Sequence, residues 1–358
     1  MTAGVIVSRQ AGTAAAFHPL LRLLRDARPD LDLSVFCYPD SRDFLPSGSI
    51  IERFGDARET LDQLTDVAFV LTGTSEEVAG DALWWSWSRQ RGVRSVAFVD
   101  QWVNYWQRFT SDPARGDRFN HLPDCVAVVD GLAKRRLEES GLASGIIVET
   151  GTPVLDDLFT APGNAGERTR ARYLKDHRDI LLLYACEGIW PDDRTDLEFL
   201  DAATLERSLA LCCEAAGWHA ERGDGNLTLL LKPHPRQILS GALPGAPRSS
   251  ADGLSIHICD HGRVEMLHAA DIVLGAHSMP LYEASMLGKP AISIQPDKKH
   301  VRDLTDGRAG IDVVTDIEQL KQALGQALDL VAQSASRPRP APGEPSHARR
   351  FLSALDLL

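Results

Sequence analysis

The sequence has 358 residues and a formal net charge of −12, with 44% hydrophobic and 25% charged residues. This length exceeds the usual size of one hydrophobic core, so two domains are expected in a chain of ordinary globular composition. The negative charge argues against a general binder of nucleic acid, which would need basic surfaces. It leaves room for a local cationic pocket and for peripheral membrane contact.

No apolar run approaches the roughly 20 residues that span a bilayer, and the first ten residues lack the pattern of a secretory signal. The six cysteines form no CxxC pair of the kind that binds metal, and most lie inside apolar runs, which is typical of buried thiols. We therefore expect a protein without a transmembrane segment in the reducing cytoplasm.

Short apolar segments alternate with helical patterns along the first half of the chain. The expected strands are residues 3–8, 32–38, 67–74, 94–101, 125–130 and 144–151. A glycine-containing turn follows the first strand, and the first helix is expected to begin at His18. Continuous apolar runs separated by helices indicate a parallel sheet that is covered on both faces.

The alternation pauses at residues 158–178, which are polar and contain Pro162 and Gly163, and then resumes. The expected strands of the second half are residues 180–188, 227–235, 254–260, 271–278, 290–295 and 310–315, with a long helix over residues 197–223. The second half therefore predicts another parallel sheet, followed by a proline-rich connector.

The sequence thus predicts an α/β fold of two doubly wound, Rossmann-like domains that face a cleft. The predicted parts are an acceptor domain over residues 1–165, a nucleotide-donor domain over residues 166–335, and a connector with a C-terminal helix over residues 336–358. Ligands of such sheets bind at the carboxyl ends of the strands, so candidate site residues are expected there.

A basic turn, "LLLKPHPR", ends one of the expected strands of the second half. Lys232, His234 and Arg236 alternate, so in an extended conformation their side chains would share one face. Two prolines make the turn rigid. Clustered cations of this kind suit a phosphate or a diphosphate, although a solvated surface turn is the alternative.

Two further strand ends carry polar residues. The turn from Gly275 to Ser278 includes His277 and precedes a helix, which is a favourable place for an anion. Glu283 lies farther along this helix, where its carboxylate could accept hydrogen bonds from a ribose. The alternative is that Ser278 only caps the helix and that Glu283 is exposed. Glu187 follows another strand, and the three turns would meet at one edge if their strands are neighbours.

The segments "KPHP" and "DIVLGAHSMPLYEASMLGKPAIS", together with "ETGTPVLDDL" at residues 149–158, resemble GT-B glycosyltransferases. The His-Pro turn is similar to that of bacterial capsule, sialyl and glycerol-phosphate transferases, and the fold is shared with nucleotide-sugar 2-epimerases. The resemblance implies that His234 and Ser278 contact donor phosphate or nucleotide and that Glu283 contacts the ribose.

The first loop departs from these families. When Pro19 is matched to the proline of the "GTGGHxxP" pattern, Ala16 stands at the histidine position, and His18 immediately precedes the proline. The "GTRPE" pattern of the epimerases is also missing, because Ala14 and Ala15 replace its arginine and proline. The epimerase reading is weakened by this difference.

Three residues are candidates for the catalytic base. Asp100 ends an apolar strand and is the first choice, since an aspartate at a strand end can accept a proton from an acceptor hydroxyl. Glu187 and His18 are the alternatives, although His18 could equally be a helix-start residue.

Aromatic residues cluster in two segments of the first half. The segments contain Trp102, Tyr105, Trp106 and Phe109, and then Trp84, Trp85 and Trp87. The first group could stack on a sugar or pack on the domain core. The three tryptophans of the second group are not expected to face one core, so one should be exposed.

These observations predict a metal-independent glycosyltransferase that moves a sugar from a nucleotide-activated donor of the UDP, CDP or CMP type to a glycan, lipid-linked or small-molecule acceptor. No cofactor is expected, and the one segment similar to a DxD metal motif, residues 191–193, reads as a helix cap. The alternatives are a nucleotide-sugar 2-epimerase, a CDP-linked polyol-phosphate transferase and a non-catalytic protein of the same fold.

Overall fold

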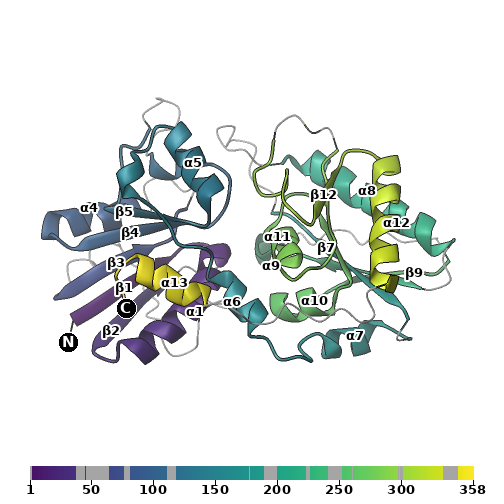
Figure 1. The fold of residues 1–358 in the computed structure, drawn as a ribbon, viewed down its shortest axis with the longest axis horizontal. Coiled ribbons are helices and arrows are strands. Elements are labelled where there is room, and N and C mark those ends of the chain that lie inside the picture. Colours follow the sequence, from purple (N-terminus) through teal and green to yellow (C-terminus); the bar gives the residue numbers. More distant parts are fainter. Residues whose placement is uncertain are drawn as a thin grey trace. The chain divides into compact units, whose positions relative to one another are not determined.

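The computed structural model contains all twelve expected strands, arranged in two units (Figure 1). It describes residues 2–37, 45, 64–75, 81–110, 118–176, 178–188, 200–222, 226–240, 252–259, 261–296, 298, 301–333 and 346–358. Unit 1 contains the described residues up to 156 and those from 346 to 358, and unit 2 contains those from 157 to 333. The predicted α/β class is confirmed.

The sheet of unit 1 has six parallel strands in the order β2-β1-β3-β4-β5-β6. The strands are β1 (Thr2–Ser8), β2 (Leu31–Cys37), β3 (Val67–Thr72), β4 (Arg94–Val99), β5 (Cys125–Val128) and β6 (Ile147–Glu149). The direction in which strands are added reverses between β1 and β3. Such a reversal leaves a crevice at the carboxyl ends of the two strands, where ligands of these folds bind.

The sheet of unit 2 is also parallel, in the order β12-β11-β10-β7-β8-β9. The strands are β7 (Ile180–Ala185), β8 (Leu227–Lys232), β9 (Leu254–Ile258), β10 (Ile272–Gly275), β11 (Ala291–Ile294) and β12 (Ile311–Val314). Here the reversal falls between β7 and β10. This strand order is that of the Rossmann fold.

The helices of unit 1 include one that the chain supplies from its C-terminus. The helical segments are α1 (Ala11–Ala27), α4 (Ala82–Arg91), η1 (Gln107–Phe109), α5 (Gly131–Glu139), η3 (Ser144–Ile146) and α13 (His347–Ala354), while α6 (Val154–Phe159) contains the boundary between the units. Helix α13 packs on α1 (Figure 1). The rings of Phe351 and Phe98 meet edge to face, with their centroids 5.1 Å apart. The Asp156 carboxylate accepts the N–H groups of His347 and Ala348 and so caps this helix.

The helices of unit 2 are α7 (Glu167–Tyr173), α8 (Ala202–Ala220), α9 (Pro235–Ser240), α10 (Arg263–Ala269), α11 (Met279–Met286) and α12 (Ile317–Gln333). The Asp201 side chain caps α8 by accepting the N–H of Thr204. Helices α8 and α12 pack against each other and share a core with the sheet (Figure 1). The leucine and isoleucine runs of the strands supply most of that core, as their apolar pattern predicts.

The first helix begins earlier than the sequence pattern suggests. Helix α1 starts at Ala11, so His18 lies within the helix and Pro19 is an internal residue. The prediction that the helix begins at His18 is therefore wrong. The alanine-rich stretch after Gly12 favours helix strongly enough to outweigh the local cost of glycine and proline, and the apolar face of the helix is buried.

The expectation of an exposed tryptophan in α4 is also wrong. Trp84, Trp85 and Trp87 are 4%, 2% and 6% exposed. Trp85 donates its indole N–H to Thr72 and packs on Phe109, with a ring separation of 5.7 Å. Neighbouring elements thus cover more than one face of the helix, which the pattern of one helix cannot reveal.

All six cysteines are free thiols, and all but Cys213 are buried, as predicted. Among the described residues, no helix combines the length and the apolar character that a membrane span requires.

Candidate functional site

Three polar turns of unit 2 meet at the carboxyl edge of its sheet. Strands β10, β7 and β8 are consecutive neighbours, and they end at Gly275, Ala185 and Lys232. The prediction that the three turns would share one edge is confirmed, because the three strands are neighbours and parallel. The reversal of strand order lies between β7 and β10, so Glu187 and the turn before α11 flank the place where a ligand would bind.

Glu187 and His277 connect the first two of these turns. The Glu187 carboxylate accepts a hydrogen bond from the backbone N–H of His277. Burial raises the pKa of Glu187 to about 7, although this hydrogen bond and the nearby Arg302 oppose the shift. Burial and the positive charge of Arg302 lower the pKa of His277 to about 4. The imidazole is therefore neutral near pH 7, whereas the glutamate titrates there.

Three polar atoms at this edge are buried without a hydrogen-bond partner among the described residues: His277 Nε2, Ser278 Oγ and Glu283 Oε2. Ser278 is the N-cap residue of α11 by its backbone, but its side chain makes no capping hydrogen bond. A Cβ on Gly275 would lie 3.2 Å from Ser278 Oγ, so the glycine leaves room for this hydroxyl. Buried polar atoms normally have a hydrogen-bond partner, so these three atoms call for a water, an ion or a ligand.

Glu283 is held by an arginine that the sequence pattern did not single out. Its side chain is 2% exposed, and its Oε1 forms an ion pair with Nη1 of Arg263, the first residue of α10. The alternative of an exposed Glu283 is therefore wrong. Because Arg263 engages only Oε1, the second carboxylate oxygen is the one left without a described partner. The sequence pattern does not distinguish Arg263, because a single arginine at a helix start is common on protein surfaces.

Lys232 is a cation of the basic turn whose charge interacts with those of Glu283 and Arg263. It is the last residue of β8 and is partly buried. Burial lowers its pKa, while the charge of Glu283 acts in the opposite direction. A partly desolvated ammonium group beside a carboxylate oxygen is suited to hold an anionic group of a ligand.

The prediction that Lys232, His234 and Arg236 share one face of an extended segment is wrong for Arg236. Helix α9 begins at Pro235, directly after the turn, and the Gln237 side chain accepts the N–H of His234. Proline is favoured in the first turn of a helix, which explains why the extended segment ends here. The Arg236 side chain lies outside the described part of the chain.

His234 lies against the turn that carries Glu187. A Cβ on Gly188 would lie only 2.9 Å from His234 Nδ1. The glycine therefore permits the close approach of the imidazole to the end of β7. The basic turn and the glutamate turn are packed together at the sheet edge.

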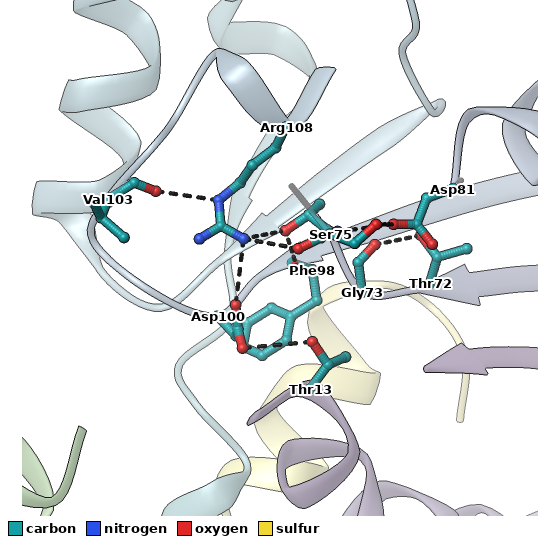
Figure 2. Close-up of polar contacts among 10 residues, drawn as sticks. Thr13, Thr72, Gly73, Ser75, Asp81, Phe98, Asp100, Val103 and Arg108 are labelled. Atoms are coloured by element: carbon teal, nitrogen blue, oxygen red, sulfur yellow. Dashed lines mark hydrogen bonds and ion pairs between the residues drawn. The ribbon is translucent and has the colours of Figure 1, made fainter. Parts of the chain in front are cut away.

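A second group of polar side chains lies at the carboxyl edge of the unit 1 sheet, and Figure 2 shows how they converge on Arg108. The Arg108 guanidinium donates to Val103 O and to both oxygens of Thr74, and its Nη1 lies 3.6 Å from Asp100 Oδ1. Asp100 Oδ2 accepts a hydrogen bond from Thr13 Oγ1 at 3.5 Å. Asp100 is 6% exposed and Arg108 is 5% exposed, so the ion pair is buried.

This cluster lies at the reversal point of the first sheet. Thr13 belongs to the first turn of α1, which follows β1, and Thr74 follows β3. A Cβ on Gly12 would lie 3.0 Å from Asp100 Oδ2, and one on Gly73 would collide with Thr13. Glycine at both positions therefore allows the strand ends and the helix to approach Asp100 closely.

His18 and the aromatic side chains of residues 102–109 are the remaining predicted site features of unit 1. His18 lies two turns into α1, partly buried. Among the aromatic residues, Trp102 donates its indole N–H to Asp130 and is buried, and Phe109 is fully buried. These two side chains belong to the core, whereas Tyr105 and Trp106 are partly exposed.

Within the described residues, no three His, Cys, Asp or Glu side chains are grouped so as to hold a metal ion. The DxD-like segment at residues 191–193 lies outside the described part of the chain.

No protein-family model matches the chain, and no curated protein matches its sequence. Solved structures do match its fold. The UDP-GlcNAc 2-epimerase from Methanocaldococcus jannaschii aligns with a TM-score of 0.66 at 15% identity, over 99% of both chains. The UDP-GlcNAc 2-epimerase from Neisseria meningitidis bound to UDP-GlcNAc aligns with a TM-score of 0.64 at 12% identity, also over 99% of both chains.

Alr3699/HepE from Anabaena, in complex with UDP and glucose, aligns with a TM-score of 0.58 at 9% identity, over 99% of both chains. The chain therefore has the two-domain α/β fold of the GT-B type that these proteins share. At such low identities the likeness establishes the fold and not the reaction.

Proposed function

We propose that the protein is an enzyme that binds a UDP-sugar in unit 2 and breaks the bond between its anomeric carbon and the diphosphate. The observation that carries the proposal is the set of buried atoms without described partners at the sheet edge, His277 Nε2, Ser278 Oγ and Glu283 Oε2. Similar folds in structures with bound UDP or UDP-GlcNAc support the choice of ligand.

In this proposal the ribose and the diphosphate are bound by different parts of the edge. Glu283 Oε2 accepts hydrogen bonds from the ribose, while Arg263 keeps the carboxylate in place. Ser278 Oγ, the Lys232 ammonium group and the His234 imidazole bind the diphosphate. Fixed donors and cations stabilise the departing diphosphate, which is the main electrostatic task in breaking this bond. We propose that no divalent ion is needed, so activity should survive EDTA.

We propose 2-epimerisation as the reaction. Two aligned 2-epimerases cover almost the entire chain, and they give this reaction more support than the glycosyl transfer that the sequence pattern favoured. In this reaction the base removes the C2 proton as the bond from C1 to UDP breaks, which leaves a C1–C2 double bond. UDP then adds back at C1 while a proton returns to the other face of C2. Asp100 is our candidate for the base. The direct test is incubation with UDP-GlcNAc in D₂O. Deuterium at C2 and a second epimer, both detected by NMR, are expected.

Glycosyl transfer is the second candidate, because one observation favours it. Ala14 stands where the epimerase pattern has an arginine, and it is fully buried in α1. This chain therefore lacks the basic side chain of that pattern at this position. Release of UDP that depends on an added acceptor, without deuterium at C2, would replace the first proposal by the second. Failure to bind UDP or any UDP-sugar would contradict both.

A further inference from the structure

Glu187 lies next to the proposed diphosphate site without a clear role in it. It follows β7 at the point where the strand order of unit 2 reverses. Its carboxylate accepts the backbone N–H of His277, and the next residue is Ser278, whose hydroxyl has no described partner. A phosphate oxygen that reaches Ser278 Oγ would therefore lie close to the carboxyl group.

The charged and titratable groups around Glu187 do not offset the cost of burying its negative charge. Arg302 stabilises the charged carboxylate from the segment after β11, Cys186 directly precedes Glu187, and Tyr184 lies near the end of β7. Lys232 and His234 belong to the basic turn, and His234 packs against Gly188, the residue after Glu187. Burial outweighs these contributions and raises the pKa of Glu187 to about 7. The imidazole of His277 is neutral at this pH, because its pKa is lowered to about 4.

A diphosphate beside Glu187 would place two negative groups next to each other in a poorly hydrated site. Two negative groups close together favour protonation of the one with the higher pKa, which here is the Glu187 carboxylate. Resting on the proposed function, we propose that Glu187 binds the diphosphate as a neutral carboxylic acid and that each bound nucleotide-sugar takes up one proton from solvent. The protonated oxygen then donates to a phosphate oxygen, and the other oxygen continues to accept the N–H of His277.

Calorimetric titration tests the proton uptake directly. The ligand is an analogue of UDP-GlcNAc with a methylene group between the sugar and the phosphate, which cannot react and does not titrate between about pH 6 and about pH 8. Heats measured in buffers of different ionisation enthalpy give the number of protons bound. We expect almost no proton uptake at about pH 6 and uptake of roughly one proton above pH 7. Above pH 7 the affinity for the analogue should fall about tenfold per pH unit.

Two variants separate Glu187 from other groups. Glu187→Gln is a neutral analogue that can still accept from His277 and donate to phosphate, so its affinity should not depend on pH and should equal that of the wild type at pH 6. Glu265→Gln is the matched control in the same unit, because Glu265 pairs with Arg168 at the surface. It should retain the pH dependence of the wild type.

The outcomes are distinguishable. Binding by the wild type without proton uptake would overturn this inference and leave the proposed function intact. Proton uptake that persists in Glu187→Gln would also overturn it, and its loss in His277→Gln or in His234→Gln would show which histidine takes up the proton. Absence of binding at every pH would overturn the proposed function and this inference together. A thermal melt checks that each variant folds. If Glu187→Gln does not fold, loss of the proton uptake in His234→Gln or His277→Gln overturns the inference, and its retention in both variants supports it.

Discussion

The carboxyl edges of the two sheets hold their buried charged side chains through different contacts. In unit 1, Arg108 is bonded to Val103 and Thr74 and paired with Asp100, which also accepts from Thr13 (Figure 2). In unit 2, buried atoms of His277, Ser278 and Glu283 have no hydrogen-bond partner among the described residues.

Both edges lie at a reversal of strand order, so topology alone does not explain this difference. The side chains of unit 1 form a network that orients its members in advance, as a catalytic group requires. Those of unit 2 retain hydrogen-bonding capacity for a ligand. Under the proposed function, the same position of the fold serves internal order in unit 1 and ligand binding in unit 2.

The largest expected effect comes from Asp100→Asn. If Asp100 is the base, turnover should fall by about 10²–10⁴-fold while the affinity for the UDP-sugar changes little. Rates and dissociation constants measured on the same variant check this prediction. A wild-type rate in Asp100→Asn together with an inactive Glu187→Gln would place the base in unit 2.

The same variant also tests the buried ion pair. Removing the charge of Asp100 leaves Arg108 without its carboxylate, so the free energy of unfolding should fall by about 3 kcal/mol. A double-mutant cycle with Arg108→Gln, followed by urea denaturation, should give a coupling of roughly 1–3 kcal/mol. Additive effects would show that the pair does not act as a unit and would weaken the contrast between the two edges.

Ser278→Ala tests the unit 2 edge. If Ser278 Oγ donates to a charged phosphate, its loss should weaken UDP binding roughly 10- to 100-fold, by the usual strength of such a hydrogen bond. The melting temperature of the free protein should not fall, because the hydroxyl has no described partner to lose.

Ser293→Ala is the matched control. Ser293 Oγ donates to Ala276 O and accepts from Gln295 in the same unit. This variant should lower the free energy of unfolding by about 1–3 kcal/mol, since it leaves buried groups unsatisfied. Calorimetric binding and thermal melts of both variants give the comparison, and a large loss of stability in Ser278→Ala would identify that serine as structural.

Arg263→Gln should have a smaller effect that concerns the ribose. Without the ion pair, Glu283 is less firmly oriented, and the preference for UDP over 2′-deoxy-UDP should fall several-fold, within the range of a single hydrogen bond. Competition binding with the two nucleotides measures this preference. Equal weakening of both nucleotides would mean that Arg263 contributes charge and does not position Glu283.

Gly188→Ala should produce the smallest change. The added methyl group would press on the His234 imidazole, from which its carbon would lie 2.9 Å away, and should weaken UDP binding a few-fold. Gly145→Ala is the control, since a Cβ there meets nothing within 4 Å. If Gly188→Ala binds UDP as tightly as Gly145→Ala does, the exact position of His234 is unimportant for binding.

Much of the fold could be predicted, because each strand is a short apolar run and each run lies between helical patterns. The local exceptions had physical causes. Helix α1 extends back to Ala11 through alanines, although Gly12 and Pro19 are poor helix formers. The tryptophans of α4 are all buried because several elements surround the helix. Neither fact follows from the residues of one segment.

The candidate site of unit 2 was predictable in its turns but not in its contacts. Ser278 and Glu283 could be singled out because small polar residues and a carboxylate follow a buried strand, and His277 because it stands in the same turn. Arg263 could not, since its partner lies 20 positions away on another helix. The helical position of Arg236 was missed because Pro235 was read as part of an extended turn, whereas it begins α9.

The order of apolar and polar residues along the chain therefore determines the strands, the helices between them and the residue types at the strand ends. The pairing of Glu187 with His277, of Glu283 with Arg263 and of Asp100 with Arg108 depends on which strands are neighbours and how the helices pack on them. A hydrogen bond or ion pair requires two groups within a few ångströms, and groups far apart in the sequence meet only through tertiary packing. Burial acts in the same way, because the desolvation that shifts the pKa of Glu187 comes from the surrounding elements and not from its neighbours in the chain.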